Sequence, residues 1–275
     1  MLRKRDYFYL GDNRALTILK TGENFMIDTE SLDLAVSIIS VGFWEPWIER
    51  HLIKIAKQGA NIIDAGANVG YYSVRLGNKI GPTGRLFAFE PHPKTYFFLK
   101  NNLYINGLTH CTAENVGLSN TGSHDDEMWF MPHQKAGGFV TRDKETDLSD
   151  RGFQKANITL QQLDESVPKE MKFDLIKIDV EGFEPNVLYG AQNVLERSPD
   201  LHLAVELSPS GWEGQGNDPM DVFDYLKDLG FSFRLATSDN KLQPITPIEM
   251  IEAAGTLESA GTLGYVTSFF ASRVY

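Results

Sequence analysis

A short stretch that carries glycines constrains the fold of this 275-residue chain most strongly. It runs from Gly66 to Gly70 and follows an apolar segment at 61–64 that is typical of a buried strand. A segment with helical spacing follows at 71–79, and a second apolar segment lies at 85–90. A strand, a loop, a helix and a second strand within about thirty residues predict a βαβ unit whose two strands are parallel.

The alternation of strands and helices continues toward the C-terminus. Strands that alternate with helices usually form a mostly parallel sheet covered on both faces. The sequence therefore predicts an α/β fold with a doubly wound, mostly parallel sheet. We recognise neither helical nor strand spacing among the apolar residues of the segment at 243–262, so this segment is predicted to be irregular. We expect further helices at 94–105, 185–196 and 219–229, and further strands at 111–116, 173–178, 201–206, 231–235 and 265–272.

Two other regions depart from this pattern. Residues 1–35 alternate polar and apolar positions around a turn signal, which predicts an N-terminal hairpin, and 40–58 has helical spacing. Glycines, charges and two short apolar pieces at 119–157 predict a hairpin insertion beside the ligand site. We therefore predict an N-terminal region, 1–58, that serves as a lid or a homodimer contact, and a main domain, 59–275, that carries the insertion.

Composition excludes several classes of protein. The net charge of -11 disfavours a nucleic-acid partner, because binding to the phosphate backbone depends on clustered Lys and Arg. No stretch approaches the ~18 apolar residues that a membrane span requires, and no apolar signal-peptide core follows the basic residues 3–5. Cys111 is the single cysteine, so an intrachain disulfide is excluded. These features predict a cytoplasmic protein without a membrane span.

The glycine loop indicates a nucleotide-type ligand, because glycine lets a ligand approach the backbone closely. The dinucleotide fingerprint needs glycine at three positions, and two of these are Asn68 and Tyr71 when counted from Gly66. A Walker loop is also excluded, since no Gly-Lys-Ser or Gly-Lys-Thr follows. The loop is therefore neither of the two common phosphate-binding motifs.

S-adenosylmethionine requires partners for its amino-acid end and an acid for its ribose hydroxyls, but no pyrophosphate cradle. Asp64 ends the first strand of the βαβ unit, and Glu90 ends the second, 24 residues after Gly66. Glu90 is placed to accept hydrogen bonds from a ribose at the edge of the sheet. The alternatives are a turn or capping carboxylate for Asp64 and an exposed strand end for Glu90.

Five sequence strings together resemble the successive motifs of the FkbM family of class I methyltransferases. The likeness spans roughly residues 42–206. The strings are GFWEP at 42–46, DAGANVGYYS at 64–73, FEPHP at 89–93, NVGLS at 115–119 and IDVEGFE at 178–184.

This resemblance implies a seven-stranded Rossmann-like sheet and transfer of a methyl group from S-adenosylmethionine. The acceptor implied is a hydroxyl of a sugar, a glycolipid or a polyketide-like small molecule. By the same matching, the residues predicted to bind the cofactor are Glu45, Asp64, Gly66, Ala67, Asn68, Gly70, Ser73, Glu90, Pro91, Asn115, Gly117 and Asp179.

The candidate catalytic residues follow two later strands. The strand at 175–178 places Asp179 at the carboxyl edge of the sheet, where ligands of open α/β sheets bind. Asp179 is the first candidate either for the base that deprotonates the acceptor hydroxyl or for the residue that orients the acceptor, and Glu181 follows on the same loop. Glu206, at the end of the next strand, is a second candidate to bind acceptor hydroxyls. The three carboxylates also suit Mg²⁺, so both a metal-free and a metal-assisted reaction stay open.

Aromatic residues suggest where an acceptor is held. We expect Trp129 and Phe139 in the insertion, together with Trp212, to form an apolar wall for it. Two other functions compete with the main hypothesis. One is methyl transfer to a nitrogen of a protein or nucleic acid, and the other is a non-catalytic module that only binds the cofactor.

Overall fold

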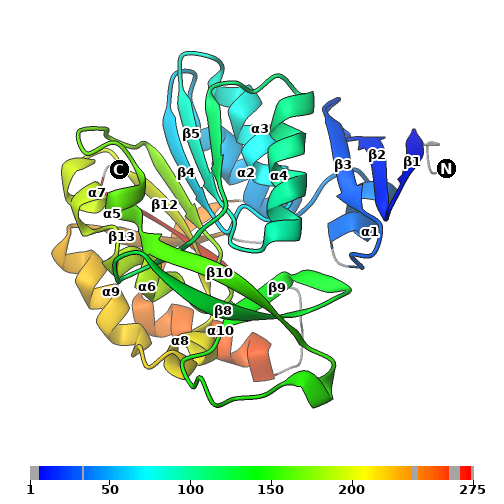
Figure 1. Ribbon diagram of the computed structural model, residues 1–275. Helices are drawn as coiled ribbons and strands as arrows, with labels where there is room; N and C mark the ends of the chain where they lie inside the picture. Colours follow the sequence, from blue (N-terminus) through cyan, green and yellow to red (C-terminus); the bar gives the residue numbers. More distant parts are fainter. Residues whose placement is uncertain (1–5, 33, 237–240, 260–266, 274–275) are drawn as a thin grey trace.

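A computed structural model describes residues 6–32, 34–236, 241–259 and 267–273 of the chain. Its largest element is an eight-stranded sheet with helices packed against both faces (Figure 1). The strand order is β14-β13-β15-β12-β11-β4-β5-β6. These strands are β4 (Asn61–Ala65), β5 (Arg85–Phe89), β6 (Cys111–Glu114), β11 (Leu175–Ile178), β12 (His202–Leu207), β13 (Ser232–Ala236), β14 (Leu242–Pro244) and β15 (Thr267–Ser272).

The predicted α/β class is confirmed, and adjacent residues of one strand show how the sheet is covered. Ile62 and Ile63 of β4 are both fully buried, but they belong to different apolar clusters. Successive side chains of a strand point to opposite faces, so each isoleucine faces a separate helical layer. Ile62 packs with α2 (Pro46–Ile55), α3 (Tyr71–Ile80) and α4 (Pro93–Ile105). Ile63 packs with the layer that includes α6 (Glu184–Tyr189), α7 (Gln192–Arg197), α8 (Pro209–Gly214) and α9 (Pro219–Asp228).

The sheet differs from the expected seven-stranded arrangement. Strands β6, β5, β4, β11 and β12 are parallel, as the βαβ pattern predicts. Beyond β12 the pairing is antiparallel, because β15 lies between β12 and β13, and β14 adds an eighth described strand at the edge. The expected strand at 265–272 corresponds to β15, and residues 265 and 266 lie outside the described residues.

The expectation of irregular structure at 243–262 is wrong. This segment contains the end of β14 and helix α10 (Pro247–Ser259), while 260–262 lies outside the described residues. Met250 and Ala254 are four residues apart on one face of α10, and both are buried in the cluster beneath the sheet. Pro247, Met250, Ile251 and Ala254 have the i, i+3, i+4, i+7 spacing of a helix, so the period was present in the sequence and was overlooked.

The N-terminal region forms a three-stranded antiparallel sheet of β1 (Tyr7–Gly11), β2 (Arg14–Ile18) and β3 (Asn24–Asp28). The predicted hairpin is the β2–β3 pair, and β1 extends it. Asn102 of α4 fixes this sheet to the main domain, since its side-chain amide accepts a bond from the Met26 N–H and donates one to the Met26 carbonyl. Figure 1 shows β3 beside α4, with the short helix α1 (Leu34–Ser40) following.

The predicted insertion contributes to a second sheet, which has the order β7-β10-β8-β9. Its strands are β7 (Gly117–Ser119), β8 (His124–Met131), β9 (Gln134–Val140) and β10 (Gln154–Gln162). Strands β8 and β9 form an antiparallel hairpin, and β10 returns beside β8 (Figure 1). The short elements η1 (Ser149–Arg151) and α5 (Leu163–Ser166) flank β10. Among the described helices, none combines the length and the apolar character needed to span a bilayer.

Candidate active site

A cleft lies at the carboxyl ends of the parallel strands, and the insertion sheet forms its opposite wall. It holds about 1110 Å³ of space free of protein atoms, including the solvent at its mouth. The sequence-predicted site residues that line it are Glu45, Gly66, Ala67, Asn68, Glu90, Pro91, Gly117, Asp179, Glu181 and Glu206.

The glycine loop lies against the loop that follows β11. Gly66 has a φ of +72°, and a Cβ added there would lie 1.8 Å from the carbonyl oxygen of Asp179. Glycine is therefore required at this position both for its dihedral angle and for the close approach. Asn68 also has a positive φ, 50°, which is uncommon for a residue with a side chain and marks a constrained backbone.

Glu90 is held at the floor of the cleft by the glycine loop. Its carboxylate oxygens accept hydrogen bonds from the backbone N–H of Asn68 and of His92, each at 2.9 Å. The residue is only 7% exposed. Burial raises the pKa of Glu90 to about 7, although the two backbone N–H groups act in the opposite direction.

Four of the predicted cofactor-binding residues are described but do not line the cleft: Asp64, Gly70, Ser73 and Asn115. Ser73 donates a hydrogen bond of 2.6 Å to Asp64, and both residues are fully buried. The Asn115 side chain donates to the backbone carbonyls of Glu90 and Pro91, so it shapes the turn beside the cleft. Their role in cofactor binding stays a prediction.

Lys177 is a cleft residue that the sequence analysis missed. Its ammonium group lies 3.2 Å from the Asp179 carboxylate and 3.5 Å from that of Asp64. It also donates to the carbonyl oxygen of Gly66 at 3.2 Å. The charges of these acids raise the pKa of Lys177 despite its burial, so it is a buried cation. A lysine inside an otherwise apolar strand, two residues before Asp179, was the signal for this role.

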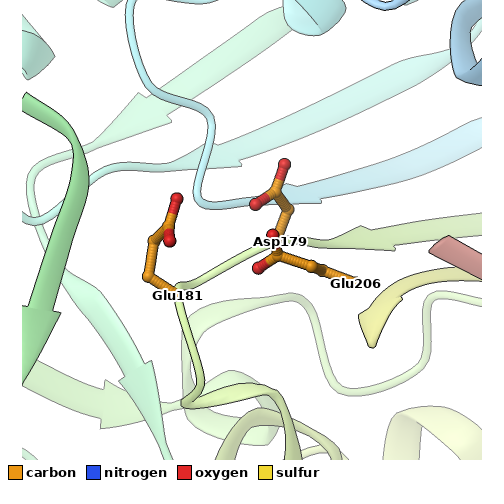
Figure 2. A group of neighbouring side chains, drawn as sticks. All are labelled: Asp179, Glu181 and Glu206. Carbon is orange, nitrogen blue, oxygen red and sulfur yellow. The ribbon is translucent and has the colours of Figure 1, made fainter. Parts of the chain in front are cut away.

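The three candidate catalytic carboxylates converge. Asp179, Glu181 and Glu206 each present an oxygen within 4.8 Å of the others. Figure 2 shows the Glu206 carboxyl pointing from its strand toward the loop that carries Asp179 and Glu181. The Glu181 side chain is exposed to the cleft, but the surrounding protein reduces its hydration; this loss and the charge of Asp179 raise the pKa of Glu181 well above its ordinary value. Burial, the charge of Asp179 and the charge of Glu181 raise the pKa of Glu206 in the same direction.

Glu184 organises the loop beneath this cluster. One oxygen of its carboxylate accepts hydrogen bonds from the N–H groups of Val180 and Gly182, and the other accepts from the Trp212 indole at 2.8 Å. The loop turns sharply here, because Glu181 has a φ of 56°. Glu184 is fully buried, so its carboxylate stabilises the loop rather than a solvated helix end.

Glu45 reaches the cleft from the N-terminal region. It precedes α2 in a left-handed conformation, with a φ of 36°, and accepts a hydrogen bond of 2.9 Å from the Tyr72 hydroxyl. Burial and the charge of Asp179 raise the pKa of Glu45 to about 7. Residues 1–58 thus contribute a side chain to the same cleft as the main domain.

The aromatic wall differs from the expected one. Phe139 lines the cleft as predicted, but Trp212 is fully buried beneath it and Trp129 is 2% exposed, and neither is a lining residue. Trp212 is buried because its indole N–H bonds to Glu184. Trp44 and Phe183 line the cleft in their place.

Comparisons with known proteins agree with these observations. The family model described as the methyltransferase FkbM domain matches residues 64–233. "Methyltransferase sdnD" of Sordaria araneosa is 29% identical over 208 residues, which cover 66% of this chain and 78% of that protein. "Methyltransferase 1" of Beauveria bassiana is 25% identical over 146 residues, which cover 47% of this chain and 57% of that protein.

Solved structures show weaker similarity. A SAM-dependent O-methyltransferase from Thermotoga maritima aligns with 100% of this chain and 87% of its own, at 14% identity and a TM-score of 0.44. That score is too low to carry an argument about the site.

Proposed function

Since the chain belongs to the methyltransferase FkbM domain family, and is therefore a methyltransferase that depends on S-adenosylmethionine, we propose that its acceptor is a hydroxyl of a small molecule. The acceptor class is a sugar, a glycolipid or a polyketide-like compound. The contact between Gly66 and Asp179 carries this proposal, because it brings the cofactor loop against the carboxylates that receive a hydroxyl proton.

The residues around the glycine loop suit S-adenosylmethionine. The buried Glu90 carboxylate uses one acceptor site on each oxygen for Asn68 and His92, and an ionised carboxylate offers about four. Two sites therefore remain for two ribose hydroxyls. These donors would also offset the loss of hydration that raises the pKa of Glu90.

When bound, S-adenosylmethionine supplies a methyl group attached to a positively charged sulfur. The chain aligns the acceptor oxygen with the methyl carbon and excludes water, effects worth about 7–11 kcal/mol in favourable cases. Asp179 would accept the proton of the acceptor hydroxyl, and bound S-adenosylmethionine would supply the methyl group for the new oxygen–carbon bond and leave as neutral S-adenosylhomocysteine. Lys177 holds the Asp179 carboxylate toward the glycine loop through their 3.2 Å ion pair.

The cleft wall supports an acceptor with apolar surface. Trp44, Phe139 and Phe183 line the cleft that also holds the carboxylates, and Val140 is a further apolar lining residue. Aromatic and aliphatic faces bind sugar rings and polyketide-like skeletons by excluding water from them. The acceptor hydroxyl then lies between this wall and Asp179.

Two alternatives remain distinguishable by experiment. Transfer to a protein or nucleic-acid nitrogen is disfavoured by the net charge of -11. A module that binds the cofactor without turnover is disfavoured by the convergence of Asp179, Glu181 and Glu206, since cofactor retention alone does not require three carboxyl groups at one point of the cleft.

The test begins with calorimetric titration of the full chain with S-adenosylhomocysteine, using NAD as the control ligand. We expect micromolar binding of the first and none of the second. S-adenosylmethionine with a labelled methyl group is then offered to matched panels of hydroxyl and amine compounds. A base-stable methyl ether supports the proposal, methylated amines alone contradict it, and binding without any product supports the non-catalytic module.

A further inference from the structure

The carboxylates at the cleft floor have the spacing of a cation site. Asp179 and Glu181 come from the loop after β11, and Glu206 comes from the neighbouring strand β12. One oxygen of each lies within 4.8 Å of the others. Oxygens on opposite sides of a bound Mg²⁺ or Ca²⁺ are roughly 4–5 Å apart, so the cluster matches this geometry with little movement.

A buried oxygen without a donor marks the same place. Glu206 Oε2 is inaccessible to solvent, and no hydrogen-bond donor among the described residues reaches it. Figure 2 shows this carboxyl directed toward Asp179 and Glu181. Its neighbour Glu184 already accepts three N–H bonds, from Val180, Gly182 and Trp212. An unsatisfied buried carboxylate oxygen is costly unless a positive ligand or a proton joins it.

The local charge is also unbalanced. In the described part of the chain, Lys177 is the cation that lines the cleft, and its ion pairs are with Asp64 and Asp179. No ion pair of the described residues involves Glu181 or Glu206. Any negative charge that Glu181 or Glu206 carries is therefore not balanced by an ion pair among the described residues.

We propose that Asp179, Glu181 and Glu206 bind one hard divalent cation, of which Mg²⁺ and Mn²⁺ are the representatives. Only carboxylate oxygens form the cluster, and this donor set favours these ions over Zn²⁺, which prefers nitrogen and sulfur ligands. Glu181 is exposed to the cleft, so an ion and its remaining water ligands have access.

The use of the cation rests on the proposed function. A hard cation beside Asp179 would coordinate the acceptor hydroxyl and make its proton more acidic. Methylation of an amine would not need this assistance, because an amine attacks without first losing a proton.

The experiment measures cation binding directly on the full chain, with and without S-adenosylhomocysteine. Mn²⁺ is titrated by electron paramagnetic resonance, in which the signal of the free ion falls as it binds, and Mg²⁺ is then added as a competitor. We expect one Mn²⁺ per chain, displaced by Mg²⁺. Glu181→Gln and Glu206→Gln should each weaken binding at least tenfold, whereas Glu213→Gln, at an exposed glutamate of α8 outside the cluster, should not.

Thermal unfolding gives a second measurement that does not depend on activity. Excess Mg²⁺ should raise the Tm of the wild type and of Glu213→Gln, but not that of Glu206→Gln. Glu206→Gln should also unfold at a higher temperature than the wild type in EDTA, because it removes a buried like charge.

The cation site would be overturned if Mn²⁺ showed no saturable binding, or if Glu181→Gln, Glu206→Gln and Glu213→Gln bound it with equal affinity. Glu206 would then be a protonated acid. Full methyl transfer to a hydroxyl in EDTA, together with no Mn²⁺ binding, would contradict the cation site but support the proposed function. Cation binding without methyl transfer to any hydroxyl would support the cation site but contradict the proposed function.

Discussion

The ammonium group of Lys177 lies 3.2 Å from the carboxylate of Asp179, two residues further along the chain. The same ammonium donates to the carbonyl of Gly66 and lies 3.5 Å from Asp64. One buried cation thus joins the ends of β4 and β11, which carry the cofactor loop and the carboxylate loop. Removal of this cation should therefore affect both loops at once.

Lys177→Met tests this relationship through stability. The variant leaves the buried Asp64 carboxylate without its cation, and breaking one partner of a buried pair costs about 3–5 kcal/mol. We expect a loss of this size in urea unfolding. Lys172→Met is the control, since Lys172 is exposed just before β11. A loss below about 1 kcal/mol for Lys177→Met would show that the cation is not a structural link.

Glu90→Gln tests the ribose site. The substitution keeps the size of the side chain but removes the charge and half of the acceptor oxygens. Hydrogen bonds to charged groups contribute about 1.5–3 kcal/mol each, so the Kd for S-adenosylhomocysteine should rise by about 10- to 100-fold. Glu114→Gln changes an exposed glutamate at the end of the adjacent strand β6 and should leave the Kd unchanged. If calorimetry gave both variants the same affinity for S-adenosylhomocysteine, Glu90 would not be the residue that binds the ribose.

The pH dependence of binding follows from the raised pKa of Glu90, which burial moves to about 7. Ribose hydroxyls donate to the carboxylate, so binding requires the deprotonated form. Below pH 7 a proton must leave Glu90 on binding, and the affinity should fall by up to about tenfold per pH unit. Above pH 8 the affinity should be constant.

The ligand for this pH series is 5′-methylthioadenosine, which keeps the ribose but lacks the titrating amino-acid end. Glu90→Gln should bind it weakly and with no change between pH 6 and pH 8. A wild-type affinity that stays constant across this interval would mean that Glu90 does not receive the ribose.

Asp179→Asn separates binding from turnover. The amide keeps the shape of the side chain but cannot take the hydroxyl proton, and a positioned base typically contributes about 10² to 10⁴ in rate. We expect kcat to fall by this factor, while the Kd for S-adenosylhomocysteine changes only a few-fold. Asp200→Asn, at an exposed position before β12, provides the matched control. Retention of full kcat in Asp179→Asn would exclude this residue as the base.

The sequence was sufficient to predict the parallel half of the sheet. The apolar strands at 61–65 and 175–178, and the glycine loop between strand and helix, are local features that fold as their periods indicate. The carboxylates at strand ends could also be predicted to meet, because parallel strands place their carboxyl ends at one edge. Glu90, Asp179 and Glu206 accordingly line one cleft.

Other features of the site could not be predicted, because they depend on contacts between segments that are distant in the sequence. Lys177 was not recognised because its charge is balanced by Asp64, more than a hundred positions earlier in the chain. Trp212 was assigned to the cleft wall because its bond to the buried Glu184 has no local signature. Helix α10 is a different case, because Pro247, Met250 and Ala254, its buried residues among the described side chains, have helical spacing that was overlooked.

The position of β15 has a consequence for biosynthesis. Strands β12 and β13 leave the ribosome before β15, the strand that separates them in the sheet, has been made. Until then their backbone edges are unpaired, which exposes a nascent chain to wrong partners. Glu206 of β12 pairs with Ser268 of β15, so this part of the cleft floor gains one of its two neighbouring strands only when β15 has been made. A partly translated chain can therefore hold a folded glycine loop and still have no competent catalytic centre.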